Sequence, residues 1–156
     1  MLKTNNYAKV KLLEIDELIK TLNILEEHRT PSWGKMNASQ MIVHCQQFID
    51  LYLGKIKVPF YYNFAGMTFG WLFFRYITSI NPNKTPKNLP TASQLKIKEK
   101  KIDFTIEKKK LIEKLYLIKQ LNKTIKNPIY GNLSASKTKF LIKHHCMHHF
   151  YQFNLL

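Results

Sequence analysis

The stretch Lys143-His144-His145-Cys146-Met147-His148-His149 places four of the six histidines of the chain within six consecutive positions. It lies in the segment 134–153, which has neither proline nor glycine and follows a turn-forming sequence, 127–131. Ser134, at the start of this segment, is a residue type that caps helix N-termini. We therefore predict a helix over 134–153, and its histidines direct the interpretation of the rest of the chain.

At 3.6 residues per turn, the four histidines form two pairs one turn apart, His144 with His148 and His145 with His149. The second pair shares a face with Thr138, Leu141, Ile142 and Phe153, whereas the other side carries Lys139, Lys143, Phe140, Met147 and Phe150. The lysines favour His145 and His149 as the inward pair. Because apolar residues also lie on the lysine side, a rotated helix with the first pair inward stays an alternative.

Two imidazoles one turn apart on a buried face have the spacing at which helical histidines bind a divalent metal ion. The alternative is a pair of core histidines that only make hydrogen bonds. Few carboxylates are available as a third ligand, since the chain has only ten acidic residues and none after Glu113. His44, at the edge of an apolar helical stripe, is a better candidate. Three neutral imidazoles leave the ion an open position for water, thiolate or substrate.

Apolar spacing predicts further helices over 13–27, from Asn37 onward, and from Asp103 to Lys126. Asn37 and Gln40 have the spacing of a capping box, and Asp103 is suited to an N-cap. We interpret Cys45 and Cys146, which are adjacent to candidate ligands, as small buried side chains of the core.

The aromatic segment 60–80 contains Gly66 and Gly70 at a spacing that can mark helix packing in membranes. Asn63 and Arg75 leave its apolar interior shorter than the roughly 20 residues that a membrane span requires. We expect a buried helix and no membrane span, and contact with a membrane surface stays an alternative.

The run 81–91 contains three prolines and several asparagines, which disfavour regular secondary structure. We expect a long proline-rich loop here. With four or five helices and no alternating strand pattern, the predicted fold is all-α, a helical bundle that forms a single domain over 1–156. Bundles place metal sites between facing helices, so the helix that carries His44 is expected beside the last helix.

The chain is strongly basic, with a formal net charge of +15. Only Arg29 and Arg75 are arginines, whereas base recognition favours arginine, so we expect weak, sequence-independent binding of nucleic acid and no specific site. Residues 1–9 lack the apolar core of a signal peptide, and the two cysteines do not resemble a secreted disulfide framework. The predicted compartment is the cytoplasm.

His44, preceded by Met41-Ile42-Val43 and followed about a hundred residues later by His145-x-x-His148-His149-x-x-Gln152-Phe153, resembles the DinB-like superfamily of metal-binding four-helix bundles. The segments 33–38, 84–86 and 127–131 are similar to one uncharacterised bacterial branch of it, and the resemblance covers most of the chain. It implies a four-helix bundle in which His44, His145 and His149 hold a divalent ion, for which we expect zinc or nickel.

Members of the superfamily include transferases that use low-molecular-weight thiols and a thiol-dependent isomerase. The resemblance implies a metal-dependent enzyme, a thiol S-transferase or a hydrolase, with a small-molecule substrate such as a low-molecular-weight thiol. His148, Tyr151 and Gln152 are candidates for one of two roles: contact with the substrate, or contact with the metal ligands from behind, which would hold those ligands in place. A non-catalytic metal-containing binding or stress-response protein stays an alternative, because no carboxylate general base is evident. The sequence is compatible with a homodimer as well as a monomer.

Overall fold

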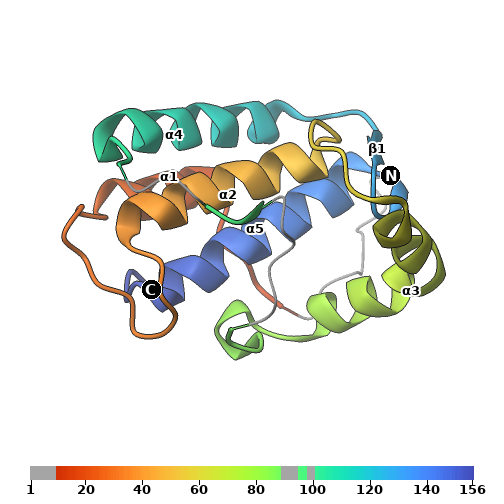
Figure 1. Ribbon diagram of the computed structural model, residues 1–156, viewed down its shortest axis with the longest axis horizontal. Coiled ribbons are helices and arrows are strands. Elements are labelled where there is room, and N and C mark those ends of the chain that lie inside the picture. Colours follow the sequence, from red (N-terminus) through yellow and green to blue (C-terminus); the bar gives the residue numbers. More distant parts are fainter. Residues whose placement is uncertain (1–9, 89–94, 98–100) are drawn as a thin grey trace.

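The computed structural model describes residues 10–88, 95–97 and 101–156 (Figure 1). These residues are mostly helical, and they form five α-helices, one short 3-10 helix and a two-stranded sheet. The elements are α1 (Ile15–Asn23), α2 (Ala38–Tyr52), α3 (Phe60–Ser79), η1 (Pro82–Lys84), α4 (Phe104–Gln120), β1 (Ile125–Asn127), β2 (Gly131–Leu133) and α5 (Ala135–Gln152). The prediction of a mainly helical fold is confirmed.

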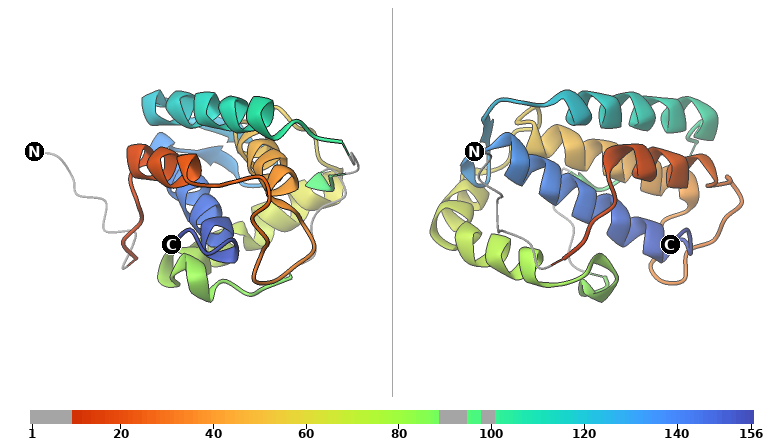
Figure 2. Two further views of the ribbon diagram at one scale, coloured as in Figure 1. Left: turned by 90° about the vertical axis from the view of Figure 1, so that its left-hand side faces the viewer. Right: turned by 180° about the vertical axis from the view of Figure 1, so that it is seen from behind.

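Helices α1, α2, α4 and α5 pack against one another around the core, as the two views in Figure 2 show. Both α4 and α5 contact α1 and α2. The side chains buried between them include Leu18, Leu22, Met41, Ile42, Ile49, Leu111, Leu115, Ile118, Ile142 and Phe150. As predicted, α2 lies beside α5, and this contact brings His44 to the histidines of the last helix.

The predicted N-termini of three helices are confirmed by their caps. The side chain of Asn37 accepts a hydrogen bond from the backbone N–H of Gln40, whose side-chain oxygen accepts one from the backbone N–H of Asn37. Asp103 and Ser134 each accept a backbone hydrogen bond from the first turn of α4 and α5. Because these hydrogen bonds join residues only three positions apart, the starts of the helices can be predicted from the sequence.

Two predicted helix ends were wrong. The helix expected over 13–27 is shorter and ends at Asn23, and the helix expected to reach Lys126 ends at Gln120. The apolar spacing does continue to Ile125, but that residue begins β1 and pairs with Leu133 of β2.

The hairpin is held by Asn127, which explains why the helix stops. Its side-chain oxygen accepts hydrogen bonds from the backbone N–H groups of Ile129 and Tyr130, and its amide nitrogen donates to the carbonyls of Leu51 and Tyr52 at the end of α2. The residues directly before this buried anchor are extended and form β1. The contact of Asn127 with the end of α2 therefore overrides the local helical pattern.

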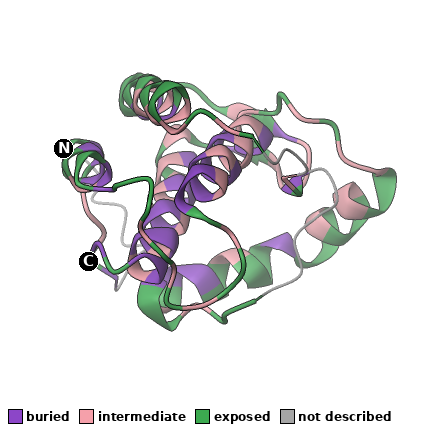
Figure 3. Cartoon of the chain, turned by 60° about the vertical axis from the view of Figure 1, so that its left-hand side comes forward, coloured by how far each residue is buried: buried purple, intermediate pink, exposed green. Residues whose placement is uncertain are grey.

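Helix α3 does not pack as expected. It lies on the side of the molecule away from α4, and most of its surface is exposed (Figures 1 and 3). Gly66 and Gly70 face the hairpin turn: a Cβ at Gly66 would overlap the carbonyl oxygen of Ile129, and one at Gly70 would lie 2.5 Å from the Tyr130 ring. The prediction of a buried helix was wrong, because only the glycine face and the last turns of α3, with Ile77 and Thr78, pack closely against the rest of the described chain.

The proline-rich segment is described in part. Pro82 to Lys84 form η1, and Pro82 is buried, so the segment begins with a short ordered turn. Residues 89–91 of the predicted loop lie outside the described residues, as do residues 1–9, on which the predicted compartment partly rests. Among the helices that are described, none has the length and apolar content needed to cross a membrane.

Replacing Gly66 with alanine tests the contact between α3 and the hairpin. In the exposed interior of a helix, replacing glycine with alanine stabilises the folded protein by about 1 kcal/mol. At Gly66 we expect a loss of about 1–3 kcal/mol in the free energy of unfolding, because the new methyl group meets a backbone carbonyl. Denaturant unfolding measures the difference, and Thr68→Ala on the exposed side of α3 is the control. A stabilised Gly66→Ala variant would contradict the contact.

Candidate metal centre

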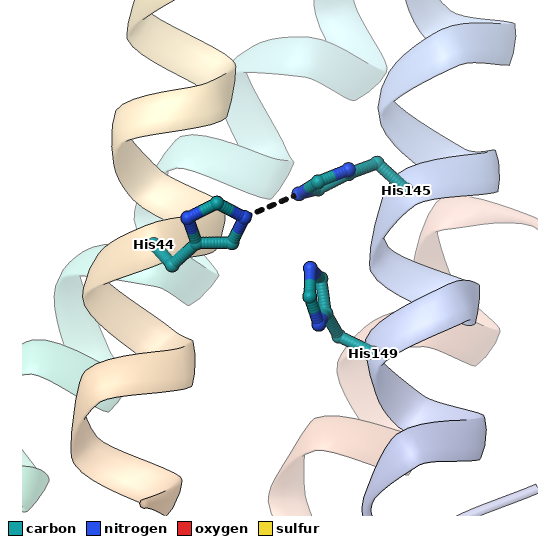
Figure 4. Close-up of side chains that lie close together, drawn as sticks. All are labelled: His44, His145 and His149. Atoms are coloured by element: carbon teal, nitrogen blue, oxygen red, sulfur yellow. Dashed lines mark hydrogen bonds between the residues drawn. The ribbon is translucent and has the colours of Figure 1, made fainter. Parts of the chain in front are cut away.

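Three histidines from two helices converge between α2 and α5. His44 comes from α2, and His145 and His149 come from successive turns of α5 (Figure 4). One ring nitrogen of each lies within 4.8 Å of those of the other two, and the Nε2 atoms of His44 and His145 are 3.1 Å apart. No other group of three or more potential histidine, cysteine or carboxylate ligands occurs among the described residues. The predicted set is therefore brought together.

The ring of His149 is oriented by a chain of two hydrogen bonds. Its Nδ1 lies 2.7 Å from Oε1 of Gln152, and Nε2 of Gln152 donates to the carbonyl oxygen of Trp33 over 2.6 Å. Because the amide oxygen can only accept, Nδ1 carries the proton and Nε2 of His149 has the free lone pair. Gln152, predicted to support the site or contact substrate, lies directly behind His149.

The ring of His145 is held by stacking. Phe48, one turn after His44 on α2, lies parallel to it, with centroids 3.5 Å apart and an angle of 2° between the planes. Tyr52 stacks on the other side of Phe48 at 4.4 Å. We did not identify Phe48 as part of the site from the sequence, although its position one turn from His44 is visible there.

Burial lowers the pKa of all three imidazoles. For His149 burial is the largest cause, followed by the nearby His44, and the pKa falls to about 3. Burial, and then the neighbouring His149 and His44, hold the pKa of His145 well below its usual value. Burial also lowers the pKa of His44, against the raising effect of a hydrogen bond with the backbone of Leu95. The rings are neutral at pH 7, which is the form that binds metal ions.

The other two histidines of α5 do not join the cluster. Nε2 of His144 lies 3.2 Å from the carbonyl oxygen of Ile80, and Nδ1 of His148 lies 3.1 Å from that of Pro82. Their ring N–H groups therefore hold the connection between α3 and η1 against α5. The rotated helix, with this pair as the inward clamp, is not the observed arrangement.

The remaining candidates lie outside the group. Tyr151 is half-buried against the core, and no contact between its side chain and the three rings is found in the described part of the chain. Cys45 and Cys146 are buried free thiols, as predicted. A hydrogen bond with Cys146, and then burial, raise the pKa of Cys45 well above its usual value, so this thiol stays protonated and is a poor ligand.

A cavity of about 640 Å³ reaches the cluster at His44. Its lining consists of Lys35, Met36, Gln40, His44, Leu95, Lys96 and Ile97. Two of these residues are exposed lysines and none of them is acidic, so the described part of the lining is positively charged. The cavity has the volume of a site for a small molecule.

In comparisons with known proteins, no protein-family model, no curated protein and no solved structure matches the chain. The DinB-like resemblance therefore stays a prediction from the sequence motifs. The geometry of the three histidines stands independently of it.

Substitution of single histidines tests the ligand set. We expect alanine at His44, His145 or His149 to weaken zinc binding by at least a hundredfold, because two protein ligands remain at an open site. His144→Ala is the matched control, since that buried histidine contacts Ile80 instead, and it should keep about one ion per chain. Competitive titration of untagged protein measures the zinc affinity, and metal analysis measures the number of ions per chain. Loss of metal in His144→Ala alone would require a different ligand set.

Acid unfolding of the metal-free protein tests the lowered pKa values. A histidine in the unfolded chain has a pKa of about 6.5, so below that pH the unfolded state binds more protons than the folded one. The free energy of unfolding should fall as pH decreases from about 6.5 toward about 3, the pKa of His149. The slope should be smaller in His149→Gln than in the unsubstituted protein, because the variant lacks the buried imidazole that gains a proton on unfolding. Equal slopes in the two proteins would contradict the burial argument.

Proposed function

We propose that His44, His145 and His149 hold one divalent metal ion, zinc or nickel, and that α1, α2, α4 and α5 form a DinB-like four-helix bundle around it. The observation that carries this proposal is the approach of three ring nitrogens within 4.8 Å, from residues about a hundred positions apart. Buried imidazoles that face one another gain little from mutual hydrogen bonds, whereas one ion would satisfy all three lone pairs.

The donor set fits such an ion. Imidazole nitrogens suit zinc and nickel, and the group contains no carboxylate that would favour magnesium or calcium. Gln152 accepts the Nδ1 proton of His149, an arrangement typical of metal-binding histidines, whose second nitrogen is held by a hydrogen bond. Three protein ligands leave a coordination position for another molecule.

We further propose that the protein is a metal-dependent enzyme acting on a low-molecular-weight thiol, as an S-transferase or hydrolase. The ion, when bound, lowers the pKa of a thiol or water that it coordinates. The chain supplies the positioning: the cavity beside His44 admits a small molecule, and Lys35 and Lys96 in its wall would bind the carboxylates that small cellular thiols commonly carry.

A non-catalytic metal-containing binding or stress-response protein is the second candidate. One observation favours it: the three-histidine group contains no acidic residue that could act as a general base. His148 is engaged with the carbonyl oxygen of Pro82, and Tyr151 does not contact the cluster in the described residues. A reaction at this site would therefore depend on the metal ion for its proton chemistry.

Turnover by metal-loaded protein separates the two candidates. We expect zinc- or nickel-loaded, untagged protein to conjugate an anionic low-molecular-weight thiol to an alkylating electrophile, with the product measured by mass spectrometry. His149→Ala should lose activity together with the metal, whereas Lys35→Ala should keep the metal and raise KM about tenfold. Full metal content without turnover on a panel of thiols would support the second candidate, and protein that never binds metal would exclude both.

A further inference from the structure

Helix α3 presents a long apolar stripe to solvent. Phe60, Phe64, Met67 and Trp71 are 79%, 61%, 77% and 64% exposed, and they follow one another at spacings of three or four residues, which places them along one side of the helix. Single exposed apolar residues are normal on protein surfaces, but a contiguous stripe marks an interaction site.

The stripe faces away from the rest of the chain. At 100° per residue, Gly66, Gly70 and the buried Ile77 lie together on a flank of α3, about 110° around the helix from the stripe, and the two glycines lie against the hairpin turn. Figures 1 and 3 show the helix at one side of the molecule, with its outer surface exposed. The glycine contact and the buried Ile77 therefore attach α3 to the fold and leave the stripe open to solvent.

The sequence around the stripe carries an excess of positive charge. The sequence from Leu51 to Asn88, which includes α3 and both of its connections, contains no acidic residue. Its basic residues are all exposed: Lys55, Lys57, Arg75, Lys84 and Lys87. Lys55 lies 3.7 Å from the carboxylate of Asp50, and Lys87 lies over the ring of Trp33. Lys57 before the helix, Arg75 a turn after Trp71 and Lys84 after the helix have no ion pair among the described residues. An apolar stripe with cations at both ends is complementary to a surface that is anionic outside and apolar beneath.

We propose that α3 docks on an anionic lipid bilayer, lying parallel to it with the stripe inserted among the headgroups. An interfacial helix of this kind buries its apolar face about 5–10 Å into the bilayer boundary, where tryptophan is favoured. The flanking lysines and arginine bind lipid phosphates, and their attraction falls as salt screens it. At 20 residues α3 is about 30 Å long, so the stripe would lie along the surface over several turns of the helix.

A second copy of this chain fits the stripe less well. Pairing two α3 helices would bring two identical basic surfaces together, each on a protein with a formal net charge of +15. No acidic residue between Leu51 and Asn88 is available to compensate. The charge therefore opposes self-association through α3 and favours an anionic partner surface.

Flotation with lipid vesicles tests the proposal. The 156-residue chain should float with vesicles that contain about one third phosphatidylglycerol and not with pure phosphatidylcholine vesicles, and high salt should weaken the binding. The double variant Phe64→Ser, Met67→Ser should bind at least tenfold more weakly. The matched control is Leu117→Ser, which changes an apolar residue on α4 that is 59% exposed.

Tryptophan fluorescence gives a second readout. Trp33→Phe leaves Trp71 as the single tryptophan, and its emission should shift to shorter wavelength with the anionic vesicles. Absence of flotation, or equal binding by the Phe64→Ser, Met67→Ser variant, would overturn the proposal. So would a concentration-dependent dimer that buries Trp71 without lipid, since the second copy would then be the occupant.

Discussion

The packing of α2 against α5 places three imidazole rings next to one another, with His44 and His149 buried and His145 half-buried. A charged ring is unfavourable there because of lost solvation, and two charged rings would repel at these distances. The rings therefore remain neutral, and their lone pairs need a partner. A divalent ion held by His44, His145 and His149, as we propose, would satisfy all three, and the proposed function depends on this constraint.

The surrounding contacts keep the rings in place. The link from His149 through Gln152 to the carbonyl of Trp33 joins the end of α5 to the connection between α1 and α2. The same connection is bound at Ser32, whose backbone N–H donates to the carbonyl of Gln152, and at Arg29, whose guanidinium donates to the carbonyl of Phe153. The ring of His149 and the chain segments around it thus belong to one hydrogen-bonded unit, so an ion bound there, as we propose, would also stabilise this part of the fold.

The two sides of the molecule differ in packing, charge and exposed apolar surface. Helices α1, α2, α4 and α5 form one side, which is closely packed. Some of its lysines form ion pairs with carboxylates, as Lys114 does with Asp50 at 2.6 Å. The side formed by α3 has no acids and little packing, and its apolar stripe is open. The proposed bilayer contact and the candidate metal centre therefore use separate elements, although His144 and His148 tie the end of α3 to the ligand-bearing helix.

The sequence by itself determined the helical character, the N-terminal caps at Asn37, Asp103 and Ser134, and the pairing of His145 with His149, because these depend on bonds and spacings within a few residues. Tertiary structure decided the rest. The anchor at Asn127 turned the predicted end of α4 into a hairpin, and the glycine face of α3 left an apolar helix exposed where burial was expected. The supports from Phe48 and Trp33 depend on how α2 meets α5, and that long-range packing cannot be read from local periodicity.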